Sequence, residues 1–303
     1  MSLDPGPGVD AAQSQVSVGS GDVVRLLPQP RHVAVNTPSR RPVLLVALLV
    51  AAVLAGLLCG VAAGRGHGPW AGTLAGRWAR PALPADAARA PLAVPLAAPS
   101  GSGGYRFLEL EDDGSGTPVR WDPCRPIHYV IRPDGAPPGG LAAVRSAIAR
   151  LEQVTGLRFT SDGTTDEAPR TGRPSMDRAR YGDRWSPVLI AFTDPTEFPS
   201  MAGFAGLGGP ESIGGNDPGE RRYVTGVVLL NRENLAQIAT WDDGSARVEA
   251  VVRHEFGHLA GLDHENDDDS LMNPRPDGTP ADYAPGDLRG LAKLSGGPCF
   301  RDY

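Results

Sequence analysis

Apolar and polar positions recur with the spacing of helices and strands from residue 105 to the end of the chain. A helix over residues 141–154 would carry its apolar side chains on one face, at Leu141, Val144, Ile148, Leu151 and Val154. Further helices are predicted over residues 245–259 and 286–294. Short apolar runs predict four strands, at residues 127–131, 157–160, 188–193 and 223–230. The glycine-rich residues 201–210 form either an edge strand or a glycine loop. This pattern predicts one packed domain over residues 105–303.

The chain before residue 105 has a different character. Residues 43–63 are apolar and uncharged, and a helix of this length would cross a hydrocarbon core of roughly 30 Å, which predicts a single transmembrane helix. The alternative is a secretory signal that is cleaved after the run, although such signals normally begin with a short charged segment. Residues 1–42 lack periodicity and predict a disordered cytoplasmic tail. Residues 64–104, rich in Ala, Pro and Gly, predict a linker.

Charge and cysteine content narrow the setting in which the domain works. The net charge of −6 and a pI of about 5.5 provide no basic face for nucleic acid, so we expect no nucleic-acid partner. Of the three cysteines, Cys59 lies in the apolar run, whereas Cys124 and Cys299 stand near the two ends of the domain. They are either a disulfide or two free thiols; a disulfide implies an oxidising compartment. We therefore expect a single-pass membrane protein with a cytoplasmic N-terminus and an extracellular domain, or else a secreted protein.

The candidate chemistry is concentrated in residues 254–264, which read HEFGHLAGLDH and fit the pattern HExxHxxGxxH. His254 and His258 are four residues apart, so on a helix both imidazoles face the same way and can bind one metal ion. Gly261 can adopt a backbone conformation closed to other residues, which lets the chain leave the helix and return His264 as the third ligand. Three protein ligands leave a fourth position open, which is typical of one catalytic Zn²⁺ with Glu255 as the base.

This motif, together with residues 270–274 (SLMNP), resembles the metzincin zinc metallopeptidases and most closely their matrixin branch. The resemblance implies that Met272 is the methionine of the turn beneath the zinc. It also implies an α+β fold, with a twisted mixed sheet of about five strands, an active-site helix and a small C-terminal subdomain. Substrate in such enzymes lies extended along the edge strand, which makes residues 201–210 the candidate rim. No upstream segment matches the inhibitory cysteine motif of matrixins, and too few histidines remain for their second zinc.

The expected function is a zinc endopeptidase that hydrolyses peptide bonds of extracellular or cell-surface proteins through a zinc-bound water activated by Glu255. The alternative is a cell-surface domain that keeps the zinc site as a scaffold and binds peptides without cutting them. Calcium is a second candidate cofactor, because two acidic clusters offer oxygen ligands, although solvated loop acids give the same pattern. The clusters are Asp267, Asp268 and Asp269, and separately Asn216, Asp217 and Glu220. The natural substrate, the regulation and the oligomeric state do not follow from the sequence.

Overall fold

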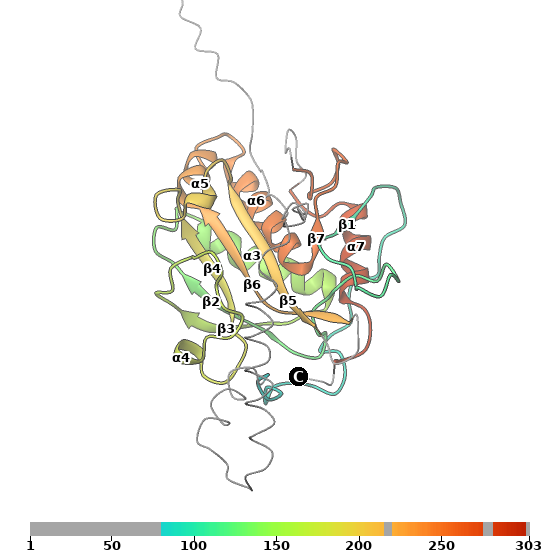
Figure 1. Ribbon diagram of the computed structural model, residues 1–303. Helices are drawn as coiled ribbons and strands as arrows, with labels where there is room; N and C mark the ends of the chain where they lie inside the picture. Colours follow the sequence, from blue (N-terminus) through green and yellow to red (C-terminus); the bar gives the residue numbers. More distant parts are fainter. Residues whose placement is uncertain (1–79, 215–219, 275–280, 301–303) are drawn as a thin grey trace, which may run out of the picture.

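The computed structural model describes residues 80–214, 220–274 and 281–300, and their largest element is a five-stranded mixed sheet (Figure 1). The strands follow the order β3-β2-β4-β6-β5 across the sheet. Four of them run parallel, and β5 pairs antiparallel with β6 at one edge. Their bounds are β2 Ile127–Arg132, β3 Phe159–Thr164, β4 Val188–Thr193, β5 Gly206–Gly214 and β6 Arg221–Asn231. The predicted α+β fold with a mixed sheet of about five strands is confirmed.

Burial along the strands explains which of them the sequence predicts well. Every residue of β4 is buried, because β4 is central and apolar clusters cover both faces of the sheet. Such a strand is a continuous apolar run, and β4 occupies the predicted residues. β3 lies at the edge opposite β5 and is mostly exposed. The strand expected at residues 157–160 therefore starts later, at Phe159, and continues through polar residues that pair with β2.

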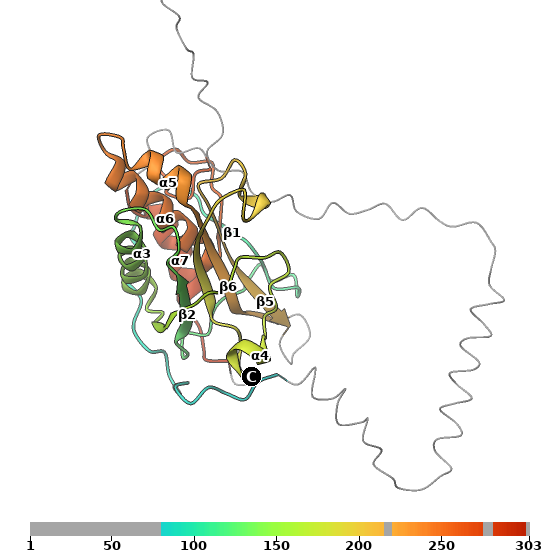
Figure 2. The same ribbon diagram turned by 90° about the vertical axis from the view of Figure 1, so that its left-hand side faces the viewer.

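Two long helices pack against the same face of the sheet, α3 over Gly140–Thr155 and α6 over Gly244–Ala260 (Figure 2). The apolar face predicted for the first helix is buried in α3 at Val144, Ile148, Leu151 and Val154. α7, at Pro285–Ser295, packs beside α3 and α6. Shorter helical segments are α4 at Arg178–Tyr181, α5 at Arg232–Ile238 and a 3-10 turn at Pro199–Met201. The edge strand expected within residues 201–210 exists as β5, displaced toward the C-terminus because this 3-10 turn occupies its predicted start.

A second, two-stranded sheet was not predicted. β1 at Arg106–Phe107 pairs antiparallel with β7 at Leu262–Asp263, which follows α6 directly. Strands of two residues carry no detectable periodicity, so only the three-dimensional contact reveals them. The pairing fixes the path of the chain immediately after the active-site helix.

Residues 80–104 form the second half of the predicted linker, and they lie along the domain. Ala88 N–H donates to Cys124 O at 2.8 Å, and Leu92 N–H donates to Pro123 O at 3.0 Å. His128 on β2 contacts Asp86 at 2.8 Å. This half of the linker is therefore attached to the folded unit. A disulfide joins Cys124 to Cys299, as one of the two interpretations of these cysteines predicted.

The predicted membrane helix at residues 43–63, the tail at 1–42 and the first half of the linker fall outside the described residues. In the part of the chain that the structure describes, no helix is both long and apolar enough to cross a membrane. The transmembrane helix stays a prediction.

Candidate metal centre

The C-terminal half of α6 and the turn after it position three histidines. His254 and His258 are one helical turn apart and both are buried. α6 ends at Gly261, whose φ of 117° lies in the left-handed region that glycine tolerates. The chain then passes through β7 and brings His264 back toward the helix.

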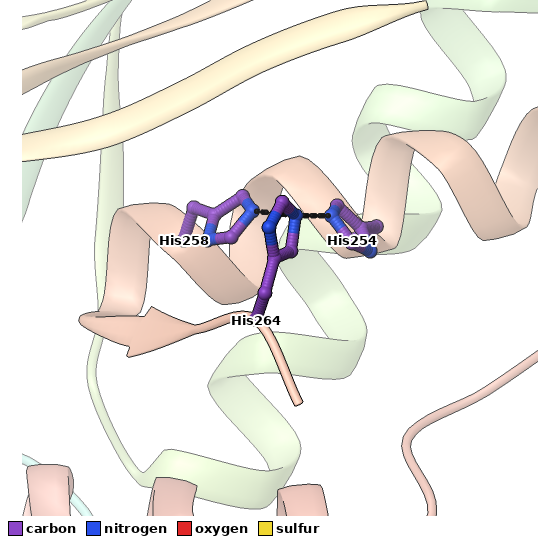
Figure 3. Close-up of side chains that lie close together, drawn as sticks. All are labelled: His254, His258 and His264. Atoms are coloured by element: carbon purple, nitrogen blue, oxygen red, sulfur yellow. Dashed lines mark hydrogen bonds between the residues drawn. The ribbon is translucent and has the colours of Figure 1, made fainter. Parts of the chain in front are cut away.

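The three imidazole rings converge on one point (Figure 3). Nε2 of His264 lies 3.2 Å from Nε2 of His254 and 3.2 Å from Nε2 of His258. The ring of His264, carried by the segment after β7, stands between the two rings that project from α6 (Figure 3). The predicted ligands are therefore brought together from two separate backbone segments.

The hydrogen-bond partners of these rings favour metal binding at their Nε2 atoms over hydrogen bonding among the three rings. His254 Nδ1 lies 2.7 Å from Leu271 O, and His258 Nδ1 lies 2.8 Å from Leu262 O. Because a carbonyl only accepts, each Nδ1 carries the proton of its neutral ring, and each Nε2 presents a lone pair. His264 Nε2 can donate one proton at most, so it cannot satisfy both lone pairs. A cation at the convergence point satisfies all three nitrogens, and Zn²⁺ prefers such an imidazole set.

The environment keeps these rings uncharged. Burial lowers the pKa of His254 to about 3, and the neighbouring His258 adds to the shift. Burial likewise lowers the pKa of His258 to about 3, with His264 as the second cause. The pKa of His264 is lowered to about 3 by burial and by His254. Neutral imidazoles are the form that binds a metal ion, so protons compete weakly with the metal at neutral pH.

Glu255 faces the edge strand of the sheet. Its side chain is buried, and its carboxylate accepts a hydrogen bond from Gly208 N–H on β5. Burial raises the pKa of Glu255 to about 8, although this hydrogen bond acts in the opposite direction. A Cβ added at Gly206 would lie 2.5 Å from Glu255 Cγ, and one added at Gly208 would lie 2.3 Å from Glu255 O. Glycines in β5 therefore allow α6 to pack directly on the edge strand.

A turn at residues 270–273 supports the histidines from below. Met272 is buried under the helix, and a Cβ added at Gly257 would lie 2.5 Å from its Sδ. Leu271 O is the acceptor for His254 Nδ1, and Met272 O accepts from Glu265 N at 3.1 Å. The turn thus contacts both segments that carry the predicted ligands, and Met272 packs against Gly257 of α6. Its place beneath a zinc ion stays a prediction.

The family model described as Matrixin, Peptidase M10, matches residues 217–294 of this chain. Those residues contain α6, all three histidines, Glu255 and the methionine turn. Residues 217–294 are therefore similar to the matrixin zinc metallopeptidases, and they contain an intact histidine triad.

Comparison with solved structures gives matches with low sequence identity and low TM-scores. The first is titled "GM1 bound form of the ECX AB5 holotoxin", with 12% identity and a TM-score of 0.32, covering 57% of this chain and 81% of that chain. The second is high choriolytic enzyme 1, a hatching enzyme zinc-protease from the medaka fish Oryzias latipes. It is 13% identical, with a TM-score of 0.31, covering 63% of this chain and 98% of that chain. A comparison with curated protein sequences gives no match.

One buried residue that supports the histidine site was not predicted from the sequence. Asp287, on α7, accepts a hydrogen bond from Ser270 Oγ at 2.6 Å and another from Leu271 N at 2.9 Å. Burial raises its pKa, and these hydrogen bonds oppose the shift. Asp287 thereby orients the backbone whose Leu271 carbonyl holds His254. The only local signal is an acidic residue in the first turn of a predicted helix, which ordinary helix capping explains equally well.

The three aspartates considered for calcium take part in local turn contacts. Asp267 Oδ1 accepts from Asp269 N at 3.1 Å, and Asp268 Oδ1 accepts from Asn273 Nδ2 at 3.2 Å. The second contact ties the loop after His264 to the methionine turn. The calcium site stays a prediction.

Proposed function

We propose that this chain is a zinc-dependent endopeptidase that cleaves extracellular or cell-surface proteins, with Glu255 as the catalytic base. The observation that carries the proposal is the convergence of the Nε2 atoms of His254, His258 and His264, with the buried carboxyl group of Glu255 on the helix that carries the first two. Zinc held there would supply a Lewis acid, which acidifies water and polarises the scissile carbonyl.

The contribution of the protein is the position and proton affinity of Glu255. Burial gives this carboxyl group a higher affinity for a proton than an exposed glutamate has, which suits a base working near neutral pH. In the proposed reaction Glu255 takes a proton from the attacking water and passes it to the leaving amine. The hydrogen bond from Gly208 holds the carboxylate against the strand along which a substrate would run.

The edge strand offers a backbone on which an extended peptide can pair. β5 stands last in the sheet, and among the described residues only β6 pairs with it. An exposed strand edge of this kind recognises peptides through main-chain hydrogen bonds. This arrangement favours an endopeptidase, because a substrate can extend past the metal in both directions.

The outcome of replacing Glu255 by glutamine tests the proposal. Glu255→Gln keeps the shape of the side chain and removes the base, so we expect kcat/KM on a peptide library to fall by roughly 10²–10⁴-fold or more. Zinc content should stay unchanged. Glu249→Gln, on the same helix but paired with Arg253, is the matched control and should retain activity.

A chelator should abolish cleavage by the wild-type protein, and added zinc should restore it. Unchanged turnover in Glu255→Gln would remove Glu255 from the mechanism. A zinc-loaded wild-type protein that binds peptides but cuts none would favour the non-catalytic alternative. That alternative has less support, since binding alone does not require a buried base next to the ligands.

The extracellular location rests on the cysteines and on the apolar run at residues 43–63. A disulfide between Cys124 and Cys299 is stable in oxidising compartments and is rare in the cytosol. We propose that the domain works outside the cytoplasm, held by the predicted span. Protease digestion of intact cells should remove residues 105–303 while leaving the N-terminal tail protected, and the reverse pattern would overturn the proposed orientation.

A further inference from the structure

The turn that joins α6 to β7 determines where two of the three histidines point. Leu262, the first residue of β7 after this turn, provides the carbonyl O that accepts from His258 Nδ1 at 2.8 Å. His264 lies only two residues further along the chain, so its position depends on the same backbone. Any contact that fixes the turn therefore acts on both His258 and His264.

The last carbonyls of a helix have no hydrogen-bond donor within the helix. At the end of α6 a side chain donates to one of them. Trp121 Nε1–H donates to Leu259 O at 2.8 Å, in a site where the indole is only 5% exposed. Leu259 is the penultimate residue of α6. The bond therefore anchors the last turn of the helix to the segment before β2.

Two further contacts hold the turn. Leu108 N–H donates to Gly261 O at 2.9 Å, next to the pairing of β1 with β7. The ring of Tyr223 packs beside Gly261, with 3.0 Å between its Cε2 and an added Cβ. Its centroid also lies 6.0 Å from that of Trp121. Among the described residues around the turn, Trp121 is the side chain that donates a hydrogen bond to a carbonyl in the last turn of α6.

We infer that Trp121 is a positioning residue for zinc binding: its hydrogen bond to Leu259 O fixes the turn that orients His258 and carries His264. Trp121 itself touches no ligand nitrogen. The inference rests on the proposed function only in taking the three histidines as zinc ligands. Residues that hydrogen-bond to a metal ligand typically contribute 10–100-fold to metal affinity. Trp121 bonds to the backbone near the ligands and not to a ligand itself, so we expect a smaller contribution.

Trp121→Phe tests this role, because it removes the N–H donor and keeps an aromatic ring. We expect the zinc dissociation constant of the folded protein, measured by competition with a chromophoric chelator, to rise about 3- to 10-fold. With zinc in excess, kcat on a peptide should change less than this. The thermal midpoint of the metal-free protein should be measured in parallel, since a purely structural role would lower it and leave the zinc dissociation constant unchanged.

Two control variants test whether the effect comes from the Trp121 N–H donor. Tyr223→Phe removes a buried hydroxyl from the other ring beside the turn, and that hydroxyl has no hydrogen-bond partner among the described residues. Trp241→Phe makes the same exchange at an indole that is 47% exposed and precedes α6, at the opposite end of the helix from His258 and Gly261. Both variants should bind zinc as tightly as the wild-type protein.

The outcomes separate this inference from the proposed function. A wild-type protein that binds no zinc contradicts the proposed function itself. A wild-type protein that binds zinc, together with a folded Trp121→Phe variant of equal affinity, overturns the role of Trp121 alone. If Trp121→Phe does not fold, β-(3-benzothienyl)alanine at position 121 keeps the ring shape and replaces the N–H by sulfur. It should then show the same 3- to 10-fold loss, and an unchanged zinc affinity would overturn the inference.

Discussion

Histidine side chains in two environments of this protein have pKa shifts of opposite sign. On β2, His128 has both ring nitrogens 2.8 Å from carboxylates, Asp162 on β3 and Asp86 in residues 80–104. Burial opposes protonation of His128, but the hydrogen bonds and charges of the two aspartates outweigh it, and its pKa is raised. At the candidate metal centre, His254 and His258 direct their Nδ1 atoms at backbone carbonyls, and their pKa is lowered to about 3.

The difference shows that a histidine binds a metal only where its surroundings keep a lone pair on one ring nitrogen. A ring with carboxylates on both nitrogens favours the imidazolium form, which has no lone pair to offer. A buried ring whose Nδ1 donates to a carbonyl keeps a lone pair on Nε2, whatever the pH between about 4 and 8. His128 is therefore a structural ion-pair partner, and the triad is suited to zinc.

The largest expected difference between the two environments is in their contribution to zinc affinity. His264→Ala removes one ligand, so its zinc dissociation constant should rise by more than the roughly 10–100-fold typical of losing an outer partner. His128→Ala should leave zinc affinity unchanged. Both are measured by chelator competition on purified protein, and equal losses in the two variants would contradict the assignment of ligands.

The next prediction concerns the close packing of α6, which carries two of the histidines, on β5. A Cβ at Gly208 would meet Glu255 O at 2.3 Å, whereas a Cβ at the adjacent Gly209 would meet nothing within 4 Å. Gly208→Ala should therefore separate β5 from α6 and lower the free energy of unfolding by about 1–3 kcal/mol. It should also reduce peptidase activity, because the partner of the Glu255 carboxylate moves.

Gly209→Ala is the matched control on the same strand and should change stability by less than about 0.5 kcal/mol. Urea unfolding of both variants measures the difference. Equal stability of the two would mean that α6 and β5 are not packed as closely as described.

The smallest effect, and the one with the clearest sign, is the pH dependence of stability. The folded-state pKa of His128 is raised, so its ion pairs stabilise the protein fully below the unfolded-state pKa of about 6.5. This contribution is lost as the pH rises through the folded-state pKa. The difference in unfolding free energy between wild type and His128→Ala should thus be about 1 kcal/mol or less at pH 5.5 and vanish at alkaline pH.

The triad should show the opposite sign in the metal-free protein. Its folded-state pKa of about 3 lies below the unfolded value, so acidification below about pH 6.5 favours the unfolded state. Thermal midpoints of metal-free wild type and His128→Ala across pH 5–9 measure both effects. A wild-type advantage that grows with rising pH would contradict the ion-pair assignment for His128.

The ligands and the base could be predicted from the sequence because one short segment contains them all. His254, Glu255 and His258 share a helix, and Gly261 permits the turn that returns His264. On a helix, the spacing of His254, Glu255 and His258 fixes their relative geometry. The long helices and the buried strand β4 could also be predicted, because each has a sustained apolar pattern.

The supporting residues could not be predicted, because their roles depend on contacts between distant parts of the chain. Trp121 and Leu259 are 138 residues apart, and no local pattern links an indole to that carbonyl. Asp287 looks like an ordinary acid near a helix start until the fold places it under the methionine turn. Residues 80–104 have the composition of a spacer, and only their backbone hydrogen bonds reveal that they belong to the domain.

The proposed metal centre requires three imidazole nitrogens to bind a single zinc ion. This can be seen in a crystal structure of the zinc-loaded protein, with anomalous scattering recorded at the zinc absorption edge. We predict one anomalous peak at about 2.0–2.1 Å from Nε2 of His254, His258 and His264. A peak elsewhere, or a His264 ring turned away from the other two with no metal between them, would contradict the account.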